Sequence, residues 1–164
     1  MTKVTGVFLS VVLLLTGTSC IKRASTGQNV TPYEQVMAIN AALGATNRSV
    51  LAGVVSLNNA QAGSQPVLSD EKAAPVIRAQ GKIAVDHIAL SKILLEGPTM
   101  ATNQADQIKL LVDDIKNQIT PLINNGDLGV KNPTSQANLS NELNSVSVLT
   151  DILLVDLKNA GVLK

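Results

Sequence analysis

Four long segments of this chain carry apolar residues at helical spacing, and short stretches rich in glycine, proline and asparagine separate them. The segments span residues 33–59, 69–96, 102–124 and 134–159. Apolar residues three and four positions apart lie on one face of a helix, and that face has to be buried against another element. The chain contains one tyrosine, one phenylalanine and no tryptophan, so its core has to consist of aliphatic side chains. The pattern predicts an all-α protein.

The spacing within the segments predicts how the helices pack. In the first segment the strongest repeat is seven residues long: Val36, Leu43, Val50 and Leu57. The third segment has the cleanest pattern: Ile108, Leu111, Val112, Ile115, Ile119, Leu122 and Ile123. Pro121 lies inside this segment and removes a backbone donor, so we expect a kink or fraying near residues 117–121. Four helices of similar length with short links predict an up-down-up-down four-helix bundle.

The second segment is an amphipathic helix with a clear predicted orientation. At 100° per residue one face gathers apolar side chains, and we expect it to be buried: Ala73, Val76, Ile77, Ile83, Ala84, Ile88, Leu94 and Leu95. The opposite face gathers Arg78, Lys82, Asp86, Lys92 and Glu96. Ile93 falls on this charged side. Ser69 is the candidate N-cap, and Gly97-Pro98 predicts the end of the helix.

The first twenty residues have a different character from the four segments. Lys3 precedes an apolar run from Val4 to Leu15, and small residues then lead to Cys20, the only cysteine. The run is shorter than the ~20 residues that span a bilayer and has the organisation of a secretory signal peptide. A polar stretch, residues 22–31, separates it from the predicted helices.

A cysteine placed directly after such a run resembles the signal segment of a bacterial lipoprotein precursor. The resemblance implies that Cys20 is acylated, becomes the first residue of the mature protein and anchors it to a membrane of the cell envelope, facing the periplasm or the exterior. The predicted division is a signal peptide over 1–19, a lipidated cysteine and flexible tether over 20–30, and the four-helix bundle over 31–164. Gly17 and Ser19 equally suit an ordinary signal peptidase, which would release a secreted soluble helical protein.

Charge limits the partners that this chain is expected to bind. The sequence has 13 Lys and Arg against 12 Asp and Glu, and removal of Lys3 with the signal peptide leaves equal numbers. Binding to nucleic acid needs a basic surface that displaces counterions, so we expect no nucleic-acid partner. The expected partners are a membrane, through the N-terminal lipid, and a protein partner or a second copy of the chain.

One polar line is predicted inside the bundle. His87, the only histidine, lies on the apolar face of the second segment, with Gln80 seven residues before it and Ser91 four after it. We interpret His87 as a structural residue held by a hydrogen bond. A pH-sensitive or ligand-binding spot is the alternative, because histidine titrates near neutrality.

Enzyme chemistry finds little support in the sequence. Ala84, three residues before His87, is not acidic, and no second His or mature Cys partner completes a metal site of the type that helix bundles carry. No Gly-x-Ser-x-Gly or phosphate-binding glycine pattern occurs. The acidic pair Asp113-Asp114 is interpreted as a solvated face. We therefore predict no catalytic residues, no cofactor and no metal.

The fourth segment carries apolar residues on both sides. Leu139, Leu143, Val146, Thr150, Leu153 and Leu157 form the predicted core face. Val148, Ile152 and Val155 lie opposite and form a candidate partner surface. The function predicted from these features is a non-enzymatic, lipid-anchored structural or adaptor protein. The alternative is a periplasmic carrier with a small apolar ligand inside the bundle near His87.

Overall fold

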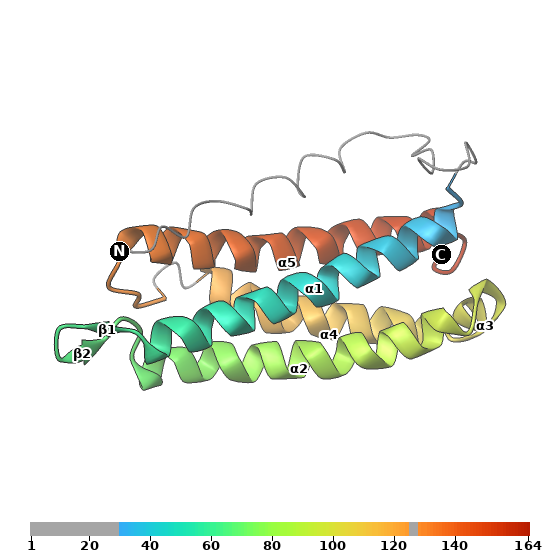
Figure 1. The fold of residues 1–164 in the computed structure, drawn as a ribbon. Coiled ribbons are helices and arrows are strands. Elements are labelled where there is room, and N and C mark those ends of the chain that lie inside the picture. Colours follow the sequence, from blue (N-terminus) through green and yellow to red (C-terminus); the bar gives the residue numbers. More distant parts are fainter. Residues whose placement is uncertain (1–29, 125–127) are drawn as a thin grey trace. The chain divides into compact units, whose positions relative to one another are not determined.

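The computed structural model describes residues 30–124 and 128–164, and this part of the chain is predominantly helical (Figure 1). Its elements are α1 (Pro32–Asn59), β1 (Gln61–Ala62), β2 (Gln65–Pro66), α2 (Asp70–Leu95), α3 (Pro98–Asn103), α4 (Ala105–Asn124) and α5 (Pro133–Asn159). The all-α class expected from the sequence is confirmed. The chain divides into two units at Thr31, and the second unit, Pro32–Lys164, contains all of these elements.

Local signals set the helix ends. Ser69 is the N-cap of α2, and the helix stops before Gly97, which adopts φ 98°, a left-handed conformation that favours glycine. Asn132 caps α5, since its side-chain oxygen accepts a hydrogen bond from the Ser135 amide at 3.0 Å. These ends agree with the predicted segments to within a residue or two.

Two predicted connections differ from the structure. The predicted third helix, 102–124, is divided into a short helix α3, which begins at Pro98, and α4, which begins at Ala105. Gln104 between them has a non-helical φ of −111°. The link at 58–66 contains a small antiparallel hairpin in which Gln61 pairs with Pro66. α4 continues through Pro121 as far as Asn124, so the helix does not fray at residues 117–121, although the proline has no backbone N–H to donate.

The four long helices lie side by side (Figure 1), and each packs against two of the others. α1 packs against α2 and α5, and α4 packs against the same two helices, while α3 contacts α2 and α4. The side chains between them form one aliphatic core that extends from Val36 to Leu163. Tyr33 packs at its edge, and its hydroxyl donates to the carbonyl of Leu94 at 2.6 Å.

The buried positions of every long helix alternate between spacings of three and four residues. In α1 this line includes Val36, Asn40, Leu43, Asn47, Val50 and Val54. In α4 it consists of Ile108, Val112, Ile115, Ile119 and Leu122, and in α5 of Leu139, Leu143, Val146, Thr150, Leu153 and Leu157. An average spacing of 3.5 residues is typical of long helices that pack at shallow angles over their whole length.

The same spacing corrects the predicted orientation of α2. Its buried line runs through Ala73, Val76, Gln80, Ile83, Leu90 and Leu94, with the partly buried His87 between Ile83 and Leu90, and Ala79 and Ile93 are also buried. Ile88 and Leu95, predicted to be core, are 55% and 73% exposed, and Ile93, predicted to lie on the charged side, is buried. A straight helix drifts by about 20° per heptad from a seven-residue repeat. The error therefore grows along the helix and concentrates in its second half.

Candidate functional site

The predicted lipidation site, Cys20, lies outside the described residues, as do the predicted signal peptide and the tether up to residue 29. Within the described residues, no helix is both long enough and apolar enough to cross a bilayer.

The predicted polar line of α2 lies against α1, where two asparagines complete it. We call this group the polar seam: Asn40 and Asn47 of α1 with Gln80, His87 and Ser91 of α2. Gln80 is fully buried, Asn40 and Asn47 are 4% and 2% exposed, and His87 and Ser91 are partly buried. The three residues predicted from the sequence are therefore brought to one helix–helix interface.

Asn40 connects two successive turns of α2 to α1. Its side-chain Nδ2 donates to Ser91 Oγ at 2.8 Å, and its backbone oxygen lies 2.8 Å from His87 Nε2. Because a carbonyl oxygen only accepts hydrogen bonds, Nε2 of His87 carries the proton in this contact. The imidazole of His87 is thus hydrogen-bonded to the backbone carbonyl of Asn40 and not to a carboxylate. The hydroxyl of Ser91 is hydrogen-bonded to the side-chain amide of Asn40 and not to a side chain that acts as a base.

Seven residues along α1, Asn47 makes a second connection. Its Nδ2 donates to the backbone oxygen of Gln80 at 3.2 Å. The side-chain oxygens of Asn40 and Asn47 and both side-chain amide atoms of Gln80 are buried without a hydrogen-bond partner among protein atoms. A buried polar group without a partner lowers stability by about 1–3 kcal/mol, so the seam fixes the register of two helices at a cost to stability.

Gly44 brings α1 close to the imidazole of His87. A Cβ atom at Gly44 would lie 2.3 Å from Cε1 and 2.6 Å from Nε2 of His87. Such distances are well inside van der Waals contact, so the ring fills the space that a side chain at residue 44 would need. The surroundings of His87 toward α1 are therefore closed by protein atoms.

The sequence interpretation missed Asn40 and Asn47. The signal that identifies them is their position on the buried line of α1, four residues after Val36 and four after Leu43. A polar residue at such a position is known to select helix register and pairing.

The carboxylates next to the helix packing have raised pKa values. Burial raises the pKa of Glu142 on α5, and a hydrogen bond from Ser49 Oγ at 3.4 Å partly offsets this effect. Burial raises the pKa of Asp86 on α2, the negative charge of Asp114 on α4 raises it further, and Lys82 lowers it. Burial likewise raises the pKa of Asp156. Among the residues that the structure describes, no cluster of three or more His, Cys, Asp or Glu side chains suits a metal ion.

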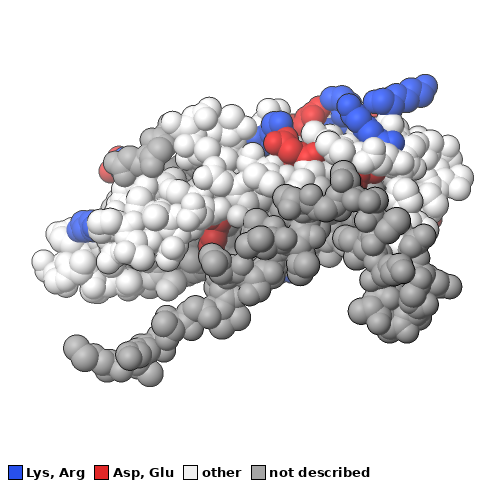
Figure 2. All heavy atoms as spheres, turned by 90° about the horizontal axis from the view of Figure 1, so that it is seen from above, with Lys and Arg blue, Asp and Glu red and all other residues white. Residues whose placement is uncertain are grey.

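The predicted solvated acids take part in electrostatic interactions. Asp113 accepts a salt bridge from Lys109 within α4 at 2.5 Å, and Asp114 acts on Asp86 of the neighbouring helix. Asp151 of α5 is bridged at 2.6 Å by Lys116 of α4. On the face seen in Figure 2, acidic and basic side chains lie close together, and most of the described surface in view is uncharged.

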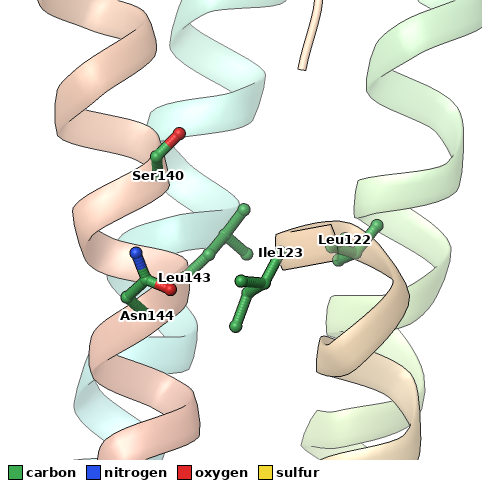
Figure 3. A pocket seen from close by; sticks show the side chains of 5 residues that line it. All are labelled: Leu122, Ile123, Ser140, Leu143 and Asn144. Atoms are coloured by element: carbon green, nitrogen blue, oxygen red, sulfur yellow. The ribbon is translucent and has the colours of Figure 1, made fainter. Parts of the chain in front are cut away.

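A small pocket lies between the end of α4 and the first half of α5 (Figure 3). It is lined by Leu122, Ile123, Ser140, Leu143 and Asn144, and its volume is about 30 Å³. A single water needs about 10–15 Å³ of such space, whereas pockets for small organic ligands are about 300–1,000 Å³. This pocket has room for one or two waters, and His87 does not line it.

The candidate partner surface on α5 differs from the prediction at one residue. Val148 and Val155 are 53% and 56% exposed. Ile152 is partly buried and packs against the core. Ile152 lies one turn from Val148 and one turn from Val155 on the same side of α5. Neighbouring core residues cover part of its side chain.

No protein-family model, no curated protein and no solved structure matches this chain.

Proposed function

We propose that this chain is a small bacterial lipoprotein, anchored to the cell envelope through Cys20, whose helical domain acts as a non-enzymatic scaffold or adaptor. The observation that carries the anchor is the position of Cys20, which follows the apolar run from Val4 to Leu15 after four small residues and precedes a polar stretch. Two acyl chains on this cysteine would make attachment effectively permanent, since each buried methylene contributes about 0.8 kcal/mol.

The domain is proposed to be an up-down-up-down bundle of α1, α2, α4 and α5. Contacts between α1 and α2 support opposite directions, because Tyr33 bonds to Leu94 near the start of α1 and Asn58 bonds to Leu68 near its end. The chain colours of Figure 1 likewise run in alternate directions through the four long helices. A bundle of this kind is rigid and presents long outer helix faces, as a scaffold requires.

Two features of the described residues favour a scaffold over a carrier. The imidazole of His87 lies against the backbone of Gly44, and the pocket between α4 and α5 has room for water only. The candidate outer surface for a protein partner is α5, where Val148 and Val155 are exposed.

The anchor is tested by metabolic labelling with an alkyne-bearing fatty acid and by cell fractionation. The wild-type protein is expected to incorporate the label and to sediment with membranes. Cys20→Ser should lose both, whereas Ser25→Ala, a change of similar size in the predicted tether, should keep both. Unlabelled wild-type protein in the soluble fraction would refute the lipoprotein proposal.

The adaptor surface is tested by placing a photo-crosslinking amino acid at residue 148 in cells, with residue 141 as the matched position two turns earlier on α5. A discrete adduct at 148 and not at 141 is expected. No adduct at either position would contradict a partner on this face.

A further inference from the structure

The outer face of α2 combines cationic and aliphatic side chains. From Arg78 to Leu95, its exposed residues are Arg78, Gly81, Lys82, Val85, Ile88, Lys92 and Leu95. The three aliphatic side chains are 66%, 55% and 73% exposed in chain order. We call these residues, apart from Gly81, the α2 outer face. None of the exposed residues in this span is acidic, but Glu96, which follows Leu95 directly and lies four residues after Lys92, is exposed.

The spacing places these side chains on a single surface. Lys82, Val85, Ile88, Lys92 and Leu95 follow one another at intervals of three or four residues, so they lie along one side of the helix. That side is opposite the buried line through Gln80 and Ile83. At 1.5 Å per residue, the face is about 26 Å long.

The cations of this face outnumber the acidic side chains near them. Within the described part of the chain, Arg78, Lys82 and Lys92 form no ion pair, whereas Lys109 and Lys116 are paired with aspartates. The one acidic residue in the span, Asp86, is partly buried and interacts with Asp114 of α4 as well as with Lys82. When Asp86 and Glu96 are set against Arg78, Lys82 and Lys92, this side of α2 keeps an excess of one positive charge beside the exposed aliphatic groups.

The exposed aliphatic residues of α5 have different neighbours. Asp151 lies between Val148 and Val155, and Lys116 of the same molecule occupies its carboxylate. Asp156, next to Val155, is only partly exposed, so the α5 surface offers little accessible acidic charge to the cations of α2 in a second copy of the chain. Charge complementarity instead favours a surface dense in negative groups above an apolar layer.

We propose that the α2 outer face docks on an anionic lipid surface, with Lys82 and Lys92 at the headgroup phosphates and Val85, Ile88 and Leu95 at the boundary of the acyl chains. A helix with this combination of residues is typical of interfacial membrane binding. The inference rests on the proposed lipid anchor, because the predicted tether over residues 20–30 spans at most about 40 Å and keeps the domain within reach of the bilayer.

The test uses the processed protein as purified from cell membranes, carrying Ile88→Cys or, as the matched control on α5, Val148→Cys. The new thiol is labelled with a fluorophore, and the protein is reconstituted in vesicles that contain a lipid with a quencher in its acyl chain. The vesicles consist of phosphatidylcholine alone or with about 30% phosphatidylglycerol, a composition that gives a negative surface.

We expect strong quenching at residue 88 in the anionic vesicles, weak quenching there in neutral vesicles, and weak quenching at residue 148 in both. Lys82→Gln with Lys92→Gln should lower the ratio of docked to undocked domain by about 25-fold, because each cation near the surface contributes about a factor of five. High salt should act in the same direction.

Equal quenching at residues 88 and 148, or no increase with phosphatidylglycerol, would overturn the proposal. Self-quenching at residue 88 that depends on protein concentration without lipid would also overturn it, since the face would then belong to a second copy. Labelling of the wild-type protein separates the two proposals: a reactive Cys20 thiol shows that acylation has failed, whatever the result at residue 88.

Discussion

The imidazole of His87 occupies the space where Gly44 has no side chain, and its Nε2 donates to the Asn40 backbone one turn earlier on α1. Gly44 and His87 make the surfaces of α1 and α2 complementary where the two residues meet. Because Gly44 has no Cβ atom, the imidazole ring of His87 is able to reach the backbone of α1. The relationship also explains how a glycine is tolerated in the middle of a long helix, where it lowers stability by about 1 kcal/mol relative to alanine.

Gly44→Ala is therefore expected to lower the free energy of unfolding by about 1–3 kcal/mol, the usual effect of overpacking, despite the higher helix propensity of alanine. Gly81→Ala is the matched control: it lies in α2 with no atom near its Cβ position, and it should raise stability by about 0.5–1 kcal/mol. Chemical denaturation measures both. If Gly44→Ala remains destabilising in a His87→Ala background, the contact with the imidazole is not the cause.

His87→Gln should fold and change the free energy of unfolding by less than about 1 kcal/mol, since a glutamine amide is able to donate to the Asn40 carbonyl in place of Nε2. The measurement is thermal unfolding followed by circular dichroism, together with a titration with zinc. Stoichiometric zinc binding that His87→Gln abolishes would contradict the structural role.

Gln80→Met is expected to stabilise the domain by about 1–3 kcal/mol, because it replaces a fully buried amide with no partner by an apolar side chain of similar length. Gln107→Met, at an exposed position of α4, should have almost no effect. Urea denaturation compares the two. A loss of stability in Gln80→Met would mean that the amide of Gln80 is satisfied, for example by an internal water.

Glu142→Gln should make stability less dependent on pH. Burial raises the pKa of Glu142 in the folded state above its unfolded value, so ionisation opposes folding. This cost is fully present above the folded pKa and disappears as the pH falls toward the unfolded pKa. The variant should therefore be more stable than the wild type at pH 7, by about 0.5 kcal/mol, and the advantage should vanish in acid. Denaturation curves across this pH range measure it, and an advantage that grows in acid would contradict the assignment.

Ile152→Lys and Val148→Lys should separate core from surface on α5. Ile152 packs against the core, so a lysine there is expected to cost about 1–3 kcal/mol. Val148 is 53% exposed, and its replacement should change stability by less than about 0.5 kcal/mol. Thermal unfolding distinguishes them. Equal effects of the two variants would mean that the orientation of α5 is wrong.

The sequence by itself determined the class of the fold and most helix limits. Apolar periodicity requires amphipathic helices, and residues that end a helix, such as Gly97-Pro98 after α2, act on the nearest backbone groups, so their effect is readable locally. The buried lines of α4 and α5 were predicted for the same reason, since each lies on a single uninterrupted face. The proposed anchor at Cys20 also rests on sequence alone.

Only the tertiary structure decided which side of α2 is buried and which polar groups meet. Ile88 and Leu95 are exposed because the buried positions of helices that pack over their full length repeat every 3.5 residues on average. A face predicted with 3.6 residues per turn therefore moves away from the buried positions with every turn. Asn40 and Asn47 join Gln80 and His87 only once α1 lies against α2 at the register that Gly44 permits. A hydrogen bond between residues 51 positions apart depends on how two helices dock, and the pattern within either helix does not encode that relation.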